Sequence, residues 1–104
     1  MIEHLLIELH ETLQKCLGNN FCYLVLFGSY ARQEDTEESD IDLLVVLHEV
    51  GNYLEKYREI APVLQEIGFL HGKFVSIVLA TQITFQENQL PFYRNIRREG
   101  RLVA

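Results

Sequence analysis

Two aspartates, Asp40 and Asp42, stand where an acidic loop gives way to an apolar run. Side chains alternate between the two faces of a strand, so both carboxylates are predicted on one side of a sheet while Ile41 turns to the core. Mg²⁺ is a hard ion that takes one or two carboxylates and completes its octahedron with water and phosphate oxygens. The pair therefore predicts a magnesium site at the mouth of a sheet.

A glycine and a serine, Gly28 and Ser29, end the preceding apolar run, with ten residues between Ser29 and Asp40. Gly28 has no Cβ, so its backbone can approach a triphosphate closely. Ser29 can offer its N–H and its hydroxyl from a helix N-terminus, where the dipole favours negative charge. This pair predicts an anion cradle about one loop away from the metal site.

Each half of this pattern also has an ordinary structural explanation. Asp-x-Asp at the start of a strand is common by chance, and a Gly-Ser turn after a strand is more often a helix cap than a phosphate site. The two halves occur together at a spacing that suits a strand, turn, helix, loop and second strand. That combination favours the functional interpretation.

Continuous and periodic apolar runs define the elements that must position these residues. Helical i, i+3, i+4, i+7 spacing predicts an amphipathic helix over residues 2–17, closed by Gly18. Continuous apolar runs bounded by turn residues predict strands that are covered on both faces. Residues 21–27 form such a continuous run, residues 41–47 are equally apolar past the two aspartates, and residues 73–80 are mostly apolar.

Capping signals and prolines predict the remaining helices. Asn52 begins a capping-box pattern, and Pro62 is expected to kink or divide the helix that follows. Residues 81–88 suit a capped turn or short helix, and a final helix is predicted from Pro91 to Gly100. The order of elements predicts an α/β fold of the α+β kind, with helices packed on a small mixed sheet of three or four strands.

Length and composition restrict the function further. A chain of 104 residues is expected to form one domain, 1–104, and its net charge of −6 argues against general adhesion to nucleic acid. The sequence contains no run of about 18 apolar residues, so no membrane span is predicted. The segment Met1–His4 lacks a basic region and a cleavage site, which predicts a cytoplasmic location.

The chain resembles the polymerase-beta-type nucleotidyltransferases, in particular the minimal nucleotidyltransferases that act as antitoxins to HEPN-domain toxins. The resemblance rests on the runs GSYAR at 28–32 and SDIDLLVV at 39–46, and it extends to the closing segment 91–100. It implies the minimal nucleotidyltransferase fold, with ATP as substrate and Mg²⁺ as cofactor in a one- or two-metal site. It also implies catalytic and metal-binding roles for Asp40 and Asp42, and nucleotide binding by Gly28, Ser29, Arg32 and Ser39.

The family pattern calls for a third carboxylate from a strand like 73–80, where this chain has Ser76. A serine hydroxyl is a neutral and weak metal ligand, so Ser76 puts catalysis in doubt more than nucleotide binding. A polar residue at a sheet edge is an equally good interpretation of Ser76.

The resemblance implies an antitoxin that transfers AMP to a tyrosine of a HEPN ribonuclease. The short chain holds little beyond the phosphate-binding sheet, so the acceptor site is expected to be shared with a second protein in a hetero-oligomer. The alternative is a degenerate transferase that neutralises its partner by binding alone, which the missing third carboxylate favours.

Four arginines gather at the end of this acidic chain: Arg94, Arg97, Arg98 and Arg101. Their steps of three or four residues predict a single stripe along the final helix. Such a stripe could attract an acidic face of the partner or the triphosphate, and the partner is the favoured interpretation. The alternative is a solvated helix face whose positive charges complement the negative end of the helix dipole.

Overall fold

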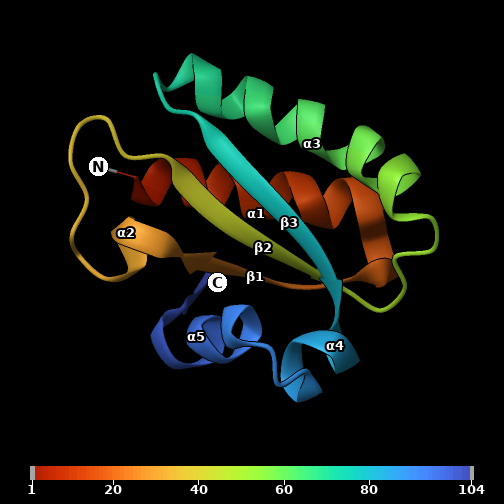
Figure 1. Ribbon diagram of the computed structural model, residues 1–104. Coiled ribbons are helices and arrows are strands. Elements are labelled where there is room, and N and C mark those ends of the chain that lie inside the picture. Colours follow the sequence, from red (N-terminus) through yellow and green to blue (C-terminus); the bar gives the residue numbers. More distant parts are fainter. Residues whose placement is uncertain (1, 104) are drawn as a thin grey trace.

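Four strands form one mixed sheet in the computed structural model, which describes residues 2–103 (Figure 1). In chain order the elements are α1 (Glu3–Leu17), the 3₁₀ turn η1 (Gly18–Asn20), β1 (Phe21–Phe27), α2 (Gly28–Ala31), β2 (Ile41–Leu47), α3 (Tyr53–Leu70), β3 (Val75–Thr81), α4 (Gln82–Glu87), α5 (Pro91–Glu99) and β4 (Arg101–Val103). The α/β class and the mixed sheet predicted from the sequence are confirmed.

The strand order is β3-β2-β1-β4, so β1 and β2 are the central strands. β2 runs antiparallel to β1 and parallel to β3, and β4 adds to the outer edge of β1 in antiparallel register. Residues 43–47 of β2 are completely buried. A central strand covered on both faces has no solvated side, which explains why its apolar run is continuous rather than alternating.

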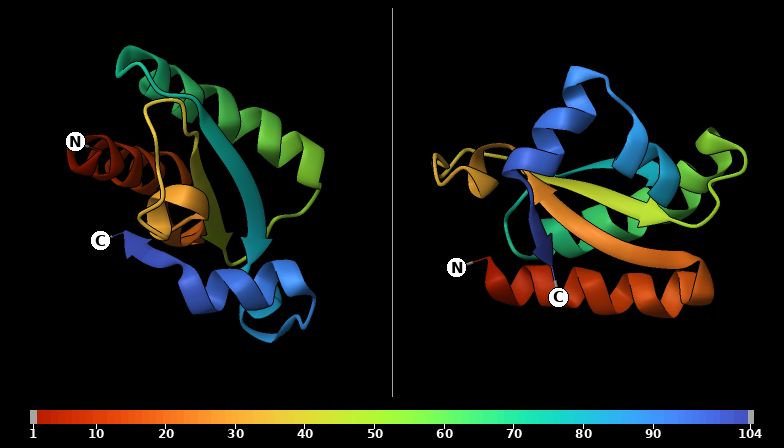
Figure 2. Two further views of the ribbon diagram at one scale, coloured as in Figure 1. Left: turned by 60° about the vertical axis from the view of Figure 1, so that its left-hand side comes forward. Right: turned by 90° about the horizontal axis from the view of Figure 1, so that it is seen from below.

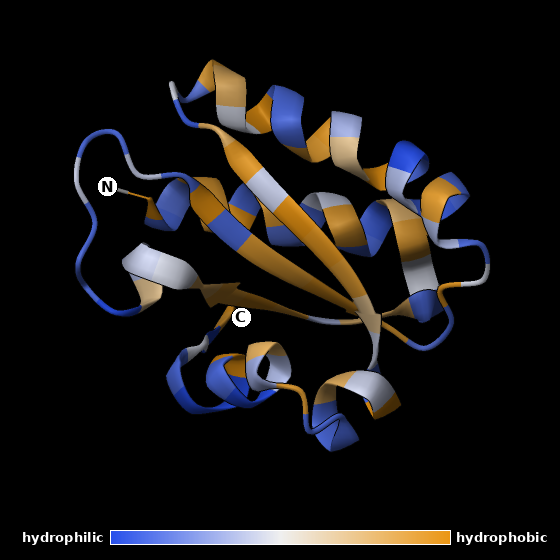
Figure 3. Cartoon of the chain, in the orientation of Figure 1, coloured by the Kyte–Doolittle hydropathy of each residue, from blue (hydrophilic) through white to orange (hydrophobic). Residues whose placement is uncertain are grey.

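Helices cover both faces of the sheet, with α1 and α3 on one side and α4 and α5 on the other (Figure 2). Ile41 and Leu43 of β2 belong to the core under α1 and α3. Leu44 and Val46 pack with residues of α4 and α5. Figure 3 shows the apolar sequence of the strands between these layers. By this alternation, Asp42 faces the α4–α5 side of the sheet.

The helix α3 begins at its predicted cap, since the Asn52 side chain accepts a hydrogen bond from the Glu55 N–H at 3.0 Å. The division expected at Pro62 does not occur, and α3 continues through that residue to Leu70. Pro62 is exposed. The carbonyl that a proline leaves without its helical partner can then bond to water, which lowers the cost of an internal proline.

The strand β4 is the element that the sequence analysis missed. It begins directly after Gly100, where an added Cβ would lie 2.7 Å from Cγ1 of Val25 on β1. Only a glycine lets the chain pass this close to β1 at that point. None of the helices within residues 2–103 combines the length and the hydropathy that a membrane crossing requires.

The predicted stripe of four arginines is wrong, because Arg101 lies on β4 rather than on α5. Arg97 is also engaged inside the protein, where its Nη1 donates to the Phe85 carbonyl at 2.6 Å and ties α5 to α4. Arg98 donates to the side chains of Asn95 and Glu99 on its own helix. The helix ends at Glu99 with Gly100 as its cap, as predicted, so the three- and four-residue spacing of the arginines does not continue along the helix to Arg101.

Candidate active site

The end of β1 and the start of β2 bring the two predicted halves of the site into contact. The β1–β2 register pairs Phe27 with Asp42, and the chain turns at Gly28 directly beside that pair. Gly28 has φ +75°, and a Cβ at this position would overlap the Asp42 carboxylate. Glycine is therefore required here both by the backbone conformation and by the space that Asp42 occupies.

Asp42 is half-buried, and its pKa is raised above the ordinary value. Burial is the main cause and the neighbouring Asp40 charge adds to it, while Arg32 acts in the opposite direction. A carboxylate that is disfavoured by burial and by a like charge is stabilised by a cation. Asp40 and Asp42 thus fit an oxygen-ligated divalent ion such as Mg²⁺, which accepts few carboxylates and keeps water or phosphate oxygens as its other ligands.

Ser76 lies next to Asp42 across the parallel β2–β3 register. Neighbouring residues in register project to the same face, so the Ser76 side chain shares the α4–α5 side with Asp42. Within residues 2–103, no group of three or more His, Cys, Asp or Glu side chains is arranged to hold a metal. The chain therefore offers a two-carboxylate site, with a hydroxyl beside it.

The loop between α2 and β2 is held by its own polar residues. The Ser39 hydroxyl accepts a hydrogen bond from the Thr36 N–H at 2.8 Å, which closes a turn just before Asp40. The Ser29 carbonyl accepts from the Glu34 N–H at 2.9 Å. These contacts give Ser39 a structural role in the loop, and its nucleotide-binding role stays a prediction.

Arg32 links α2 to both the loop and α5. Its Nε donates to Glu34 Oε1 at 3.0 Å, and its Nη1 lies 3.7 Å from Glu99 Oε2. The charge of the guanidinium also offsets part of the rise that burial and Asp40 produce in the pKa of Asp42. Arg32 is therefore positioned to act electrostatically on the carboxylate pair, and direct contact with a phosphate stays a prediction.

A cleft of about 230 Å³ lies between the Gly28 turn and α5. Its walls include Gly28 and Arg32 on one side and Phe92 and Asn95 on the other. Sequence analysis did not assign Phe92 and Asn95 to the site. Both residues lie in the closing segment 91–100, which is part of the family resemblance and could have pointed to them. Their position across the cleft from Gly28 depends on how α5 packs, which the sequence pattern does not show.

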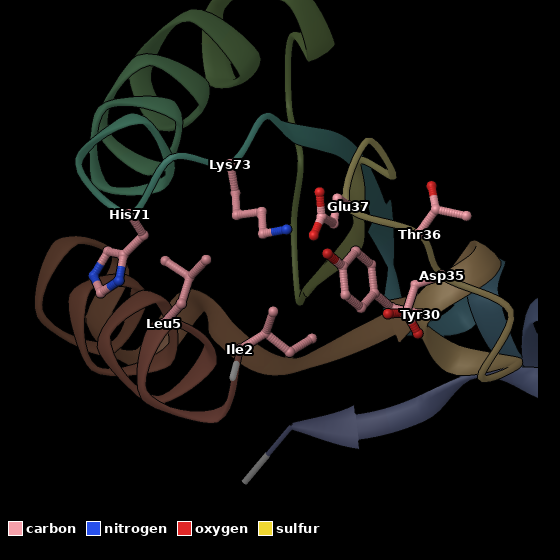
Figure 4. A pocket seen from close by; sticks show the side chains of 8 residues that line it. All are labelled: Ile2, Leu5, Tyr30, Asp35, Thr36, Glu37, His71 and Lys73. Atoms are coloured by element: carbon pink, nitrogen blue, oxygen red, sulfur yellow. The ribbon is translucent and has the colours of Figure 1, made fainter.

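A larger cavity, of about 550 Å³, contains none of the predicted site residues (Figure 4). It lies where the N-terminal end of α1, the loop at 35–37 and the chain before β3 meet. The Lys73 amine points into it, 5.6 Å from the centre of the Tyr30 ring. No sequence motif predicts this cavity, because its walls come from segments far apart in the chain.

Asp42→Asn is expected to stabilise the metal-free protein at neutral pH. The raised pKa of Asp42 means that its contribution to stability is present below the ordinary carboxyl pKa and is lost as the pH rises through the folded-state value. We expect the melting temperature at pH 7 to rise by a few degrees without divalent ions, on the order of what a fraction of a kcal/mol produces in a small domain.

Thermal unfolding across the acid-to-neutral range would measure this effect. The matched control is Asp35→Asn, a change at an exposed acid of the loop that precedes β2. An Asp42→Asn variant that melts at or below the wild-type temperature at pH 7 would contradict the conclusion that burial and the Asp40 charge disfavour the ionised form of Asp42.

Residues 8–104 match a family model described as polymerase beta, nucleotidyltransferase. One relative, named as a candidate protein adenylyltransferase of Methanocaldococcus jannaschii, is 32% identical over 81 residues, which are 77% of this chain and 75% of that protein. Another of the same kind from that organism is 48% identical over 44 residues, which are 42% of this chain and 44% of that protein. The match thus spans less than half of the second relative's length.

Solved structures share the fold at low sequence identity. A candidate nucleotidyltransferase from Sulfolobus solfataricus has a TM-score of 0.70 at 17% identity, covering 97% of this chain and 78% of that one. A toxin–antitoxin structure with AMP-PNP has a TM-score of 0.68 at 18% identity, covering 100% of this chain and 73% of that one. With the family match over residues 8–104, these findings show that the chain belongs to the polymerase beta nucleotidyltransferase family.

Proposed function

We propose that this protein is an antitoxin that binds Mg-ATP and transfers AMP to a tyrosine of a HEPN ribonuclease in the cytoplasm. The observation that carries the proposal is the close approach of the Gly28 backbone to the Asp42 carboxylate, which leaves no room for a Cβ, beside Asp40. It places a close-approach backbone and two carboxylates at one point. Those are the two parts that a metal-bound triphosphate requires.

In this proposal the residues of the chain have separate roles. The Gly28 and Ser29 backbone would hold the phosphates, while Asp40 and Asp42 would hold Mg²⁺. The ion, when bound, would neutralise phosphate charge and lower the pKa of the attacking hydroxyl. The acceptor's phenolic oxygen would bond to the α-phosphorus as the α-phosphorus–bridging oxygen bond breaks, releasing pyrophosphate, with the phenolic proton passing to solvent.

The names of the relatives support the transfer of AMP to a protein. Relatives with 32% and 48% identity are named as candidate protein adenylyltransferases, and a protein of the same fold was solved in a toxin–antitoxin structure with AMP-PNP. The HEPN fold of the partner and the tyrosine acceptor come from the sequence resemblance and remain part of the proposal.

A second candidate function is neutralisation by binding alone, without transfer. The observation in its favour is Ser76, which occupies the β3 position beside Asp42 where the family pattern calls for a carboxylate. A site with two carboxylates would hold one metal better than two, which would slow the chemistry more than the binding.

Ser76→Asp is expected to increase the rate of AMP transfer, by about tenfold or more, because a third carboxylate would complete a site for a second ion. The rate should be measured over a Mg²⁺ titration, since the gain is expected together with tighter apparent Mg²⁺ binding. Ser76→Asn is the matched control, with a similar shape and no charge. Equal rates for wild type and Ser76→Asp would contradict a metal-shell role for this position.

The proposal is tested by intact-mass analysis of a HEPN-domain partner incubated with this protein, ATP and Mg²⁺. We expect the partner to gain the mass of one or more AMP groups, and peptide mapping to place them on tyrosine. A partner whose toxicity is suppressed while its mass stays unchanged would decide for the binding-only function.

A further inference from the structure

The cleft of about 230 Å³ beside the Gly28 turn has one face of α5 as its outer wall. The α5 residues of this wall are spaced three and four apart, so they lie on a single side of the helix. They are Phe92, Asn95, Ile96 and Glu99. The opposite wall is the end of β1 and the short helix α2, at Phe27, Gly28 and Arg32. We call this space the α5 cleft.

The α5 cleft adjoins the carboxylate pair. α5 covers the face of the sheet to which Asp42 points (Figure 2). Gly28 lies in the wall of the cleft, and its backbone approaches the Asp42 carboxylate so closely that a Cβ would overlap it. One residue therefore borders both the metal site and the cleft. A nucleotide held by its phosphates at the Gly28 turn can extend its nucleoside directly into the cleft.

The size and the charges of the α5 cleft favour a small neutral group. Its volume is below the range of about 300–1,000 Å³ for sites that hold a whole drug-sized ligand, so it suits one part of a nucleotide. The two charged side chains of its walls have opposite signs, with Arg32 Nη1 3.7 Å from Glu99 Oε2. Since these charges offset each other, a neutral base fits the cleft better than a triphosphate does.

Phe92 presents an aromatic surface in the cleft. Its ring lies edge to face with the Phe27 ring, with 5.7 Å between the centroids and an angle of 87°, and it makes a similar contact with Tyr93 at 5.2 Å. These contacts hold the ring in place while 42% of the residue stays exposed. Bases of every kind stack on such rings. Phe92 therefore favours a base without selecting one.

Asn95 adds a group that can distinguish between bases. Its Oδ1 accepts a hydrogen bond from Arg98 Nη2 at 3.1 Å, which orients the amide. An amide oxygen has a second lone pair and the amide nitrogen has two protons, so the side chain can accept and donate at once. Adenine presents a donor beside an acceptor, N6–H₂ and N7, whereas guanine presents two acceptors, O6 and N7. The amide of Asn95 therefore matches adenine.

We infer that the α5 cleft binds the base of the nucleotide, with Phe92 stacked on the base and Asn95 selecting adenine over guanine. The inference rests on the proposed binding of Mg-ATP and adds how the nucleotide is chosen. Phosphates and base are then held by different elements, the phosphates by the Gly28 turn and the base by α5. Affinity for the base can therefore be changed while affinity for the phosphates is kept.

The first test compares Phe92→Leu with wild type by calorimetry in the presence of Mg²⁺. The probes are α,β-methylene-ATP, which resists cleavage at the α–β bridge, and inorganic tripolyphosphate, which has no base. We expect the variant to bind α,β-methylene-ATP about tenfold more weakly, because leucine has no ring on which a base can stack. Its affinity for tripolyphosphate should equal that of wild type. The matched control is Phe69→Leu, at a phenylalanine of α3 that is 78% exposed and lies outside the cleft.

The second test changes the choice of base through Asn95→Asp. We expect wild type to bind α,β-methylene-ATP about tenfold more tightly than α,β-methylene-GTP. A carboxylate only accepts, and the N1–H and N2–H₂ groups of guanine both donate, so the ratio of the two affinities should shift toward GTP in the variant. Gln89→Glu is the matched control, because it adds the same charge at an exposed residue just before α5. That variant should keep the wild-type ratio.

The outcomes separate this inference from the proposed function. Phe92→Leu and Asn95→Asp variants that bind both nucleotide analogues as wild type does would overturn the inference and leave the proposed function standing. A Phe92→Leu variant that loses tripolyphosphate and α,β-methylene-ATP alike would also overturn it, because a base contact cannot act on a ligand that has no base. A wild-type protein that binds none of the three probes with Mg²⁺ would instead refute the proposed function.

Discussion

Replacing Asp40 and Asp42 together by alanine is expected to abolish Mg²⁺-dependent ATP binding while the protein stays folded. Asp40 is exposed and Asp42 is half-buried with a raised pKa, so neither carboxylate stabilises the metal-free fold. Without them, the ion loses its protein ligands and the triphosphate loses the ion that bridges it to the protein. AMP transfer should fall by about a thousandfold or more, the scale of removing a catalytic metal site.

Calorimetry with Mg-ATP measures the binding directly, and thermal unfolding confirms that the double variant is folded. The matched control replaces Asp35 and Glu37, two exposed acids of the neighbouring loop, by alanine. It removes the same number of charges and should leave the affinity for Mg-ATP close to wild type. Unchanged affinity in a folded Asp40→Ala, Asp42→Ala variant would contradict the metal-site assignment.

Gly28→Ala is expected to damage both the fold and the site. The positive φ at Gly28 alone costs about 1–2 kcal/mol with a side chain present. The added Cβ would also overlap the Asp42 carboxylate, so that side chain must move away from Asp40. We expect a clear loss of stability in chemical denaturation and a loss of AMP transfer about as large as that of an Asp42 variant.

The chain contains a matched control for this change. Gly51 has φ +66°, and a Cβ there would meet nothing within 4 Å. Gly51→Ala should therefore show the cost of the backbone conformation and keep full transfer activity. If Gly28→Ala and Gly51→Ala lose equal stability and neither loses activity, then Gly28 is an ordinary turn residue and does not form part of the site.

The central elements were predictable because their signals are local. Residues 21–27 are an uninterrupted apolar run, residues 41–47 are apolar apart from Asp42, and the two segments form β1 and β2 with those bounds. Asn52 predicted the start of α3, because its capping hydrogen bond involves only Glu55, three residues further along the chain. The division predicted at Pro62 is wrong, because a single proline on an exposed helix surface is tolerated when the rest of the helix packs well.

Other features depend on contacts that are distant in sequence. β4 is three residues long and forms only because Gly100 lets the chain close against β1. Three residues are too few to show an apolar period, and the steps of three or four between the arginines placed Arg101 on the helix although Gly100 was its predicted cap. The close approach of the Gly28 backbone to Asp42 requires the antiparallel register of β1 on β2, which no local pattern specifies.

Ser76 shows what sequence analysis could and could not contribute to the site. The family pattern pointed to this position, and the parallel register of β3 on β2 places it beside Asp42. The rate of AMP transfer with the Ser76 hydroxyl at this position depends on how tightly a second metal ion binds. That affinity is not encoded in the order of residues. Phe74 illustrates the opposite case, since only the fold reveals that its carbonyl accepts a hydrogen bond from the N–H of Ile41, the residue after Asp40.

The most direct measurement is to supply the protein and a HEPN-domain partner with ATP labelled either at the α-phosphate or at the γ-phosphate, in the presence of Mg²⁺. The account predicts that the α-label becomes covalently attached to the partner while the γ-label leaves as pyrophosphate, and that neither label is incorporated with the Asp40→Ala, Asp42→Ala variant. Incorporation of the γ-label, or a partner that stays unlabelled in both reactions, would contradict it.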